Sequence, residues 1–295
     1  MVRGLGVGKE TTFGTPVVAS KWYNIVRENL ATRKTILFDE DTVGSRQLIR
    51  AARGAERVEG SVELYLNSQE IGHLLLSCLG SVTTTGTGPY THTFSIANSL
   101  PSLTLRSIMD DVKEKIVTGA LVNNLEIAST VGKARVTANI IARQETLGTA
   151  SIPSFTAQDD FVHGEVTITI AGVTKKPRRL SLRIANNLEP VEVLGDYYPT
   201  KIVPRKLSVT GSFELDFESD VEYQDFLNLT SRDLNIVFEK GDHSIQFDID
   251  KFYYTRAEVE VRGRELLVAG FDFTAVKPEA QDAVKVVLVN GDASY

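Results

Sequence analysis

The chain has very little cysteine and no long apolar run. Cys78 is the only cysteine among 295 residues, so no disulfide can form within one chain. It lies in a short apolar segment, which predicts a small buried hydrophobe and not a nucleophile. No stretch reaches the about 18 apolar residues of a membrane helix, and no signal peptide is recognisable. We therefore expect a soluble protein without a membrane partner, made in a reducing cytoplasm.

A phosphate-binding loop is also missing, although GLGVGKETT near the start has the right residue types. A Walker-type loop needs glycine five residues before its Gly-Lys pair, and that position holds Arg3. Glu10 stands where Ser or Thr should follow Lys9, and its carboxylate would repel phosphate. The glycines are also too closely spaced for a dinucleotide fingerprint. The sequence predicts a flexible N-terminal arm here.

Catalytic and metal-binding patterns are absent as well. The histidines, His73, His92, His163 and His243, show no metal-ligand spacing and have no cysteine cluster beside them. No G-x-S-x-G motif marks a nucleophile. Carboxylate runs such as 39–41 and 110–111 are typical of solvated turns. We expect a protein that is not an enzyme and that has no catalytic residue, no metal and no cofactor.

The composition indicates packed cores and no strong grip on nucleic acid. Hydrophobic residues make up 42% of the chain, which is enough to fold, and the length suits about two domains. The net charge of −6 argues against tight binding to phosphates, though it permits nucleic acid to pass by.

Alternation with a period of two dominates the sequence. In SVELYL the apolar residues Val62, Leu64 and Leu66 alternate with polar neighbours, and LSVTGSFELDF and VHGEVTITI show the same pattern. One apolar and one polar face indicate antiparallel sheets packed as sandwiches. Two segments have helical spacing instead, SQEIGHLLLSCL with Ser68 as N-cap and SDVEYQDFLNL with a capping box from Ser219 to Glu222.

The two strand-to-helix segments match each other without a gap. VEGSVELYLNSQEIGHLLLS and VTGSFELDFESDVEYQDFLN share these identical pairs: Val58/Val209, Gly60/Gly211, Ser61/Ser212, Glu63/Glu214, Leu64/Leu215 and Ser68/Ser219. The match extends to a pairing of Leu30 with Leu188 and of TANIIA with GFDFTA. The sequence therefore predicts one β-rich unit written twice. The expected division is an arm (1–21), copy one (22–146), a linker (147–161), copy two (162–276) and a tail (277–295).

Both copies contain a long polar excursion before the Gly-Ser strand. In copy one it covers 31–57 and ends in a basic series, Arg46, Arg50, Arg53 and Arg57. In copy two it covers 189–206 and contains Tyr197, Tyr198 and Pro199. Loops at the same place in both copies predict projecting contacts with other subunits, with a solvated loop or a ligand-binding loop as the alternatives. Copy one also carries a Thr- and Gly-rich insertion over 81–102.

These segments resemble the tail tube proteins of long-tailed bacteriophages. The resemblance rests on GKETTFGTPV, GSVELYLNSQEIGHLLLSCLG, PYTHTFSIANSLPSLTL and VTGALVNNLEIASTVGKARVTANIIA, in that order. It implies β-sandwich units, each with one short helix and a long projecting loop, here in tandem. It also implies rings whose inner strands form one barrel, stacked into a tube that conducts DNA. With two units in the chain, three copies would make a pseudo-sixfold ring, and six copies with an outer decorating unit are the alternative.

Further expectations follow from this resemblance. The location would be the virion tail, after assembly in the host cytoplasm, and the partners would be the chain itself, the tape measure, the tail terminator and the distal tail proteins. We expect a lumen wall poor in Lys and Arg, because basic contacts would hold passing DNA. Its candidates are Ser61, Glu63, Ser212, Glu214 and Asp216, and an ordinary solvated outer face is the alternative. The competing functions are another β-sandwich virion component, such as a tail-tip or decoration protein that binds carbohydrate or host surface, and an unrecognised β-rich hydrolase.

Overall fold

The computed structural model describes residues 4–38, 47–48, 50–110, 112–157, 159–217, 219–260 and 267–295. The fold is mainly β, as predicted, with large antiparallel sheets. The first half contains β1 (Leu5–Lys9), β2 (Lys21–Tyr23), β3 (Arg27–Glu28), β4 (Ala31–Phe38), β5 (Ala51–Tyr65), α1 (Gly72–Leu79), β6 (Gly80–Thr85), β7 (Tyr90–Ile96), β8 (Leu103–Ile108), β9 (Lys113–Ser129), β10 (Arg135–Ala142) and β11 (Gln144–Thr149). The second half contains η1 (His163–Glu165), β12 (Val166–Ile170), β13 (Val173–Lys175), β14 (Arg179–Ala185), β15 (Glu189–Val191), β16 (Lys201–Val203), β17 (Ser208–Asp216), α2 (Val221–Leu227), β18 (Arg232–Lys240), β19 (His243–Glu260), β20 (Val268–Ala275) and β21 (Lys285–Asn290).

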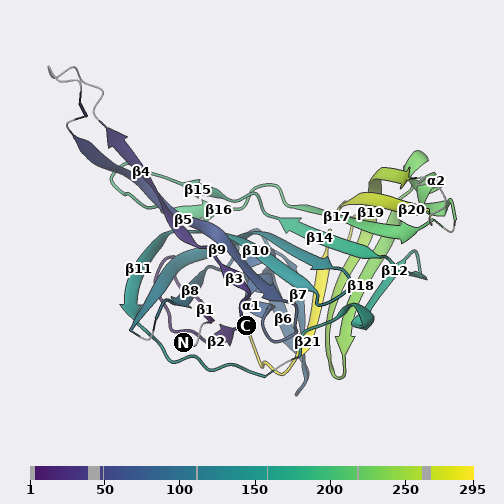
Figure 1. Ribbon diagram of the computed structural model, residues 1–295, viewed down its shortest axis with the longest axis horizontal. Coiled ribbons are helices and arrows are strands. Elements are labelled where there is room, and N and C mark those ends of the chain that lie inside the picture. Colours follow the sequence, from purple (N-terminus) through teal and green to yellow (C-terminus); the bar gives the residue numbers. More distant parts are fainter. Residues whose placement is uncertain are drawn as a thin grey trace.

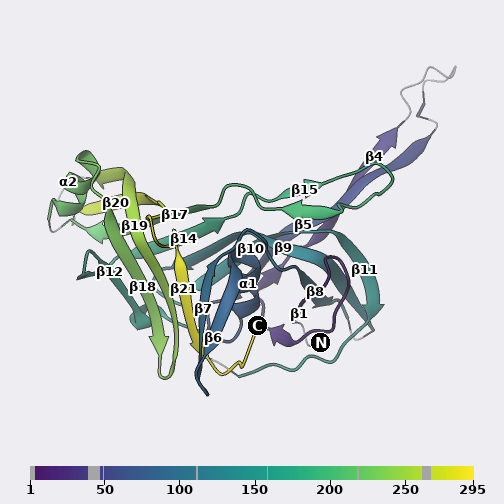
Figure 2. The same ribbon diagram turned by 180° about the vertical axis from the view of Figure 1, so that it is seen from behind.

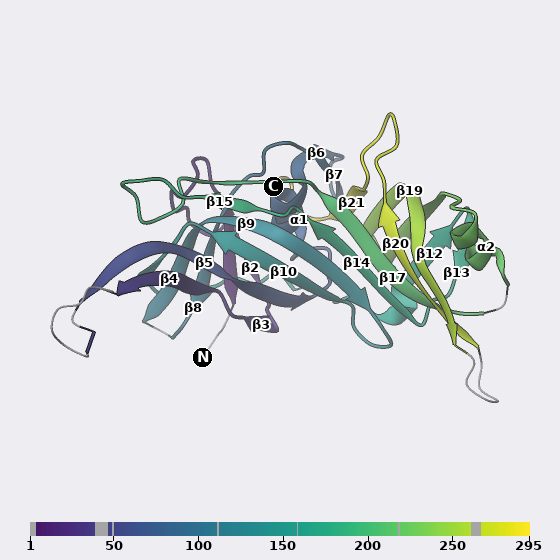
Figure 3. The ribbon, with the colours of Figure 1, turned by 90° about the horizontal axis from the view of Figure 1, so that it is seen from above.

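One antiparallel wall runs through both halves of the chain. Its order is β3–β5–β10–β9–β14–β17–β20–β19, and Figure 3 shows most of these strands side by side. The middle of the wall is the joint between β9 and β14, where Leu182 lies opposite Ile127 and Arg183 opposite Glu126. The two halves therefore share backbone hydrogen bonds and are joined in one sheet.

The two sides of this joint have the same strand order and the same register. Glu63 on β5 and Glu214 on β17 each pair with an arginine of the preceding wall strand, Arg27 or Arg179. Each also pairs with the wall strand that follows the helix, β10 or β20. The set β3–β5–β10–β9 thus corresponds strand by strand to β14–β17–β20–β19.

Irregularities of the ladders recur at corresponding places. The β9–β10 register shifts between Asn124 and Val122, so Asn123 is an extra residue in β9. The β19–β20 register shifts between Arg256 and Tyr254, so Thr255 is an extra residue in β19. A β-bulge is a specific local feature that adds one residue to a strand and bends it. The β8–β9 and β18–β19 ladders shift at matching positions too. Two unrelated β-sandwiches would not be expected to share register shifts at corresponding positions.

The wall has one buried face, and its buried residues alternate as predicted. Val62, Leu64, Phe213 and Phe273 are at most 2% exposed, and aromatic rings pack together in the second half. The sheet that covers this face is β2–β1–β8–β9–β11 in the first half and β13–β12–β18–β19–β21 in the second. The long strands β9 and β19 belong to both layers, so they tie each sandwich together. Helix α1 is buried throughout its length.

Three expected connecting segments are parts of the sheets instead. The predicted arm contains β1, which is buried at Leu5 and Val7 and pairs with β2 and β8. The predicted linker begins within β11 and ends at the fully buried Phe161. The predicted tail contains β21, which pairs with β19 and with β7. The apolar side chains of these segments have a place in the cores, and that overrides their loop-like composition.

Candidate assembly surfaces

The five residues expected to face a lumen lie on one side of the wall. Ser61 and Glu63 on β5 and Ser212, Glu214 and Asp216 on β17 alternate with buried neighbours, so they occupy the polar face. Strands β10, β9 and β14 lie between these two groups and continue the same surface. The structure therefore brings all five onto one continuous polar face.

Arginines accompany the carboxylates of this face, so the face is not poor in basic residues. Arg179 lies opposite Glu214 at 3.8 Å, and Arg178 forms an ion pair with Asp216 at 2.7 Å. Arg135 forms an ion pair with Glu63, whose hydrogen bond raises the pKa of the arginine. The arginines come from neighbouring strands, so their proximity depends on register. Alternation within one strand gave no signal for them.

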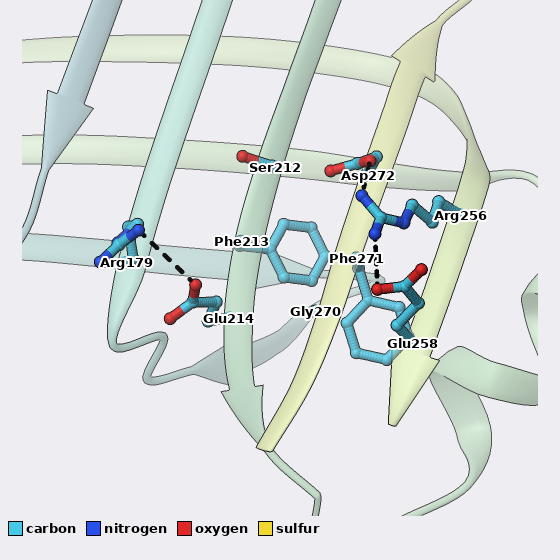
Figure 4. Close-up of a pocket in the computed structure, with 9 residues that line it drawn as sticks. All are labelled: Arg179, Ser212, Phe213, Glu214, Arg256, Glu258, Gly270, Phe271 and Asp272. Carbon is cyan, nitrogen blue, oxygen red and sulfur yellow. Dashed lines mark ion pairs between the residues drawn. The ribbon is translucent and has the colours of Figure 1, made fainter. Parts of the chain in front are cut away.

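The second half of the polar face has a hollow lined by such pairs (Figure 4). Arg256 reaches Glu258 at 2.5 Å and Asp272 at 3.6 Å, and the hydrogen bond that it donates to Glu258 raises the pKa of this arginine. The hollow measures ≈ 280 Å³ and is open beside Gly270, where an added Cβ would meet nothing within 4 Å. Among the residues that the structure describes, its lining includes no histidine and no cysteine.

The two polar excursions form hairpins that lie against each other. The β4–β5 hairpin projects from the body, and the β15–β16 hairpin runs beside it (Figures 1 and 2). Arg53 stacks on the ring of Tyr197 at 4.4 Å and donates a hydrogen bond to the hydroxyl of Tyr198 at 2.8 Å. The main-chain N–H of Glu56 donates to the oxygen of Tyr197 at 2.7 Å.

The predicted contact residues of the excursions are thus partly joined within one chain. Arg57 forms an ion pair with Glu192 of the second hairpin at 3.2 Å, and the oxygen of Pro199 accepts a hydrogen bond from Arg143 at 3.3 Å. Arg50 is exposed, and Arg46 lies outside the described residues. These contacts hold the two hairpins together as one projection.

Both hairpins expose large apolar side chains near their ends. On β4, Ile36, Leu37 and Phe38 are each exposed by half or more, and Leu194 at the end of the second hairpin is fully exposed. Apolar side chains grouped on a projecting element are typical of a surface that is covered by a partner. The contacts predicted from the sequence here were arginines and tyrosines, and these apolar residues were not among them.

A family model described as phage tail tube protein matches residues 2–275. The chain belongs to the phage tail tube protein family. It is a structural protein of the bacteriophage virion tail, and the family assembles into tubes together with other tail proteins. The match spans both halves of the chain, which agrees with a wall that is continuous across them. No curated protein matches the sequence.

The titratable groups most perturbed in this tail tube protein are buried. Burial lowers the pKa of His73 to about 4 and raises the pKa of the Cys78 thiol to about 12. The Nδ1 atom of His73 lies 3.0 Å from the hydroxyl of Tyr23, and its Nε2 atom lies 3.0 Å from that of Ser20, both within hydrogen-bond distance. Among the described residues no group of His, Cys, Asp and Glu could hold a metal, and no described helix is long and apolar enough to cross a membrane.

Proposed function

We propose that this chain is the repeating subunit of a phage tail tube and that each copy supplies two tube units. The units are those expected from the repeat, extended to include β1 and β21. Three copies would close into a pseudo-sixfold ring, and stacked rings would enclose a lumen for DNA. The observation that carries the proposal is the β9–β14 joint, which places two corresponding four-stranded sets side by side in one wall.

The continuity of the wall favours three copies over six. In a six-copy ring with one lumen-lining unit per chain, the second unit would lie outside the wall. Here β14 continues the hydrogen bonding of β9, so both units occupy the same layer. Ring closure would also remove the open edges that an isolated sheet exposes.

The polar face is the proposed lumen wall. Its arginines are held by carboxylates, as Arg179 is by Glu214 and Arg135 by Glu63. A guanidinium that already has an anionic partner gains less from a phosphate, so DNA could pass without being retained. Pairing of the arginines would thus keep DNA from being retained, as a wall poor in Lys and Arg was expected to do.

The paired hairpins are the proposed contact between stacked rings. Their mutual contacts, such as Arg53 on Tyr197, hold the projection in one direction. Their exposed ends, including Leu37 and Phe38, would be buried by the adjacent ring. The tape measure, tail terminator and distal tail proteins would meet the tube along its lumen and at its ends, after assembly in the host cytoplasm and without a membrane.

Electron microscopy of the purified chain over a range of concentrations tests the proposal. We expect hollow rings or filaments whose averaged end views show three copies of the chain around a pore. Native mass spectrometry of single, unstacked rings should give three chains. Rings of six chains would overturn the trimer. Discrete monomers at every concentration that bind glycans would favour a tail-tip or decoration protein instead.

A further inference from the structure

Two strand edges of the wall remain open at its ends. Residues 253–260 of β19 pair only with β20 within the described part of the chain. At the other end, residues 27–28 of β3 and 31–33 of β4 pair only with β5, again considering the residues that the structure describes. An open strand edge is a template for pairing with another chain.

These two edges correspond to the two strands that meet inside the chain. The half of β9 that ends at Ser129 lies between β10 and β14, and the corresponding half of β19 has β20 on one side and an open edge on the other. Likewise β14 lies between β17 and β9, and in the described part of the chain β3 pairs with β5 alone. The open strand at each end of the wall is therefore equivalent to one of the two strands that pair at the β9–β14 joint.

The registers fix which positions correspond. Leu182 lies opposite Gly211 on β17, and Leu30 lies at the same place beside Gly60 on β5. On the other strand, the bulges at Asn123 and Thr255 align β9 with β19.

We propose that the β3–β4 edge of one copy pairs with the β19 edge of a second copy in the register of the β9–β14 joint. The internal pairs Leu182–Ile127, Arg183–Glu126 and Ile184–Leu125 become intermolecular pairs. They are Leu30 with Val259, Ala31 with Glu258 and Thr32 with Ala257. This inference rests on the proposed ring and adds the identity and the register of its interface.

Burial of the side chains supports this assignment. Leu125 and Ile127 of β9 are at most 1% exposed where β14 lies beside them. Ala257 and Val259 hold the corresponding positions on β19 and are only partly buried. Their remaining exposed surface is what a strand from another copy would cover.

The charges at the far end of the interface are compatible with pairing. The register brings Arg33 opposite Arg256, and two facing arginines would normally repel. The guanidinium of Arg256 is however held by Glu258 and Asp272 of its own copy. Its charge is therefore compensated before the second copy arrives.

In the free chain the β3–β4 edge is capped by side chains at Leu30, which lies between the two strands. The N–H of Asn29 donates to Ser61 on β5, so the main-chain groups of Leu30 point to the open side. There the N–H of Leu30 donates to Glu28 Oε1 at 2.6 Å, and its oxygen accepts from Lys115 Nζ at 2.6 Å. The incoming strand has to displace both groups.

In the second half, the edge of β14 that corresponds to this one is already paired with β9, and the two capping positions hold other residue types. The ladder shifts align Lys115 of β9 with Phe247 of β19, and Glu28 with Leu180. Phe247 and Leu180 are apolar and buried. A polar pair thus occurs at the exposed edge, and an apolar pair at the edge that lies against β9.

Disulfide trapping in the full chain tests the register. Directly opposite residues of antiparallel strands have Cα atoms about 4.5–5.5 Å apart, within the range of a disulfide. The double variant Ala31→Cys/Glu258→Cys should form intermolecular disulfides, seen as dimers and trimers on non-reducing gels. Ala31→Cys/Ala257→Cys is the control slipped by one residue and should form few. Glu126→Cys/Arg183→Cys places the same pair in the internal joint and should form an intramolecular disulfide.

The outcomes separate this inference from the proposed function. Rings in the microscope with trapping at Ala31 and Glu258 support both. Rings that trap only in the slipped variant, or in neither variant while the internal control closes, overturn the register and leave the tube subunit standing. Absence of rings together with absence of trapping overturns the ring itself.

Discussion

Lys115 and Glu28 form an ion pair, 2.7 Å between Nζ and Oε1, across the open edge of the wall. Both side chains are largely buried, and each also bonds a main-chain group of Leu30. The corresponding residues of the second half are Phe247 and Leu180, which offers a substitution already accepted by this fold. We predict that Glu28→Leu/Lys115→Phe assembles at a concentration about thirtyfold lower, because two capping hydrogen bonds of about 1 kcal/mol each no longer have to be displaced. Sedimentation velocity across a dilution series measures this.

The single variant Lys115→Met is the control for this prediction. It leaves the carboxylate of Glu28 largely buried without its cation, and we expect the free energy of unfolding to fall by about 3 kcal/mol. Urea denaturation provides the measurement. An unchanged assembly threshold in the double variant, with a normal unfolding transition, would show that the pair does not restrain the edge.

The sequence was most informative where both copies keep the same spacing. The ungapped match of Glu63 with Glu214 agrees with the pairing registers, and so does the match of TANIIA with GFDFTA. The match of Leu30 with Leu188 is wrong, since the registers align Leu30 with Leu182. Excursions of unequal length follow these strands, so sequence alone could not place the gap.

Helix starts were less predictable than strands. Ser68 does not cap α1, which begins at Gly72, because the side chain of Asn67 instead accepts hydrogen bonds from the main chain of Gln69 and Glu70. Ser219 makes no N-cap hydrogen bond to α2 either. Short polar side chains have several main-chain partners within reach, and packing decides among them. Ion pairs across strands, including the one at Lys115, leave no trace in the alternation of a single strand.

The arginine pairs of the polar face should control its affinity for DNA. We predict that Glu63→Gln/Glu214→Gln binds a double-stranded oligonucleotide about tenfold more tightly at low salt, because Arg135 and Arg179 lose their carboxylate partners. Two added phosphate contacts should also steepen the logarithmic salt dependence by about 2. Fluorescence anisotropy at several salt concentrations measures both.

The control must make the same change of net charge elsewhere. Glu239→Gln/Glu279→Gln neutralises two exposed carboxylates that do not belong to the polar face. Equal gains in affinity in the two double variants would indicate a general charge effect and contradict a role for the pairing.

Buried His73 should make stability depend on pH. Its pKa is about 4 in the folded chain and 6.5 ordinarily, chiefly because burial disfavours the charged ring. The unfolded chain therefore takes up the proton first as the pH falls. Stability from this group is complete above pH 6.5 and declines by about 3 kcal/mol as the pH approaches 4.

The variant His73→Gln separates this contribution from that of the carboxylates. Its free energy of unfolding should fall less steeply between pH 6.5 and 4 than that of the unsubstituted chain, even if its value at pH 7 is lower. Parallel curves from urea denaturation would show that the ring is not kept neutral by the fold.

The exposed end of the β4–β5 hairpin should matter for stacking and not for folding. We predict that Leu37→Ser/Phe38→Ser yields rings that do not grow into filaments, since apolar side chains meant for a neighbouring ring are lost. Both side chains are more than half exposed, so the free energy of unfolding should change by less than about 0.5 kcal/mol. Ile152→Ser removes another exposed apolar side chain, in the connection between the halves, and should leave filaments unchanged. Electron microscopy of the unsubstituted chain and the two variants at matched concentration measures filament growth. Filaments of normal length from the hairpin variant would mean that rings stack through a different surface. The paired hairpins would then need another partner to cover their ends.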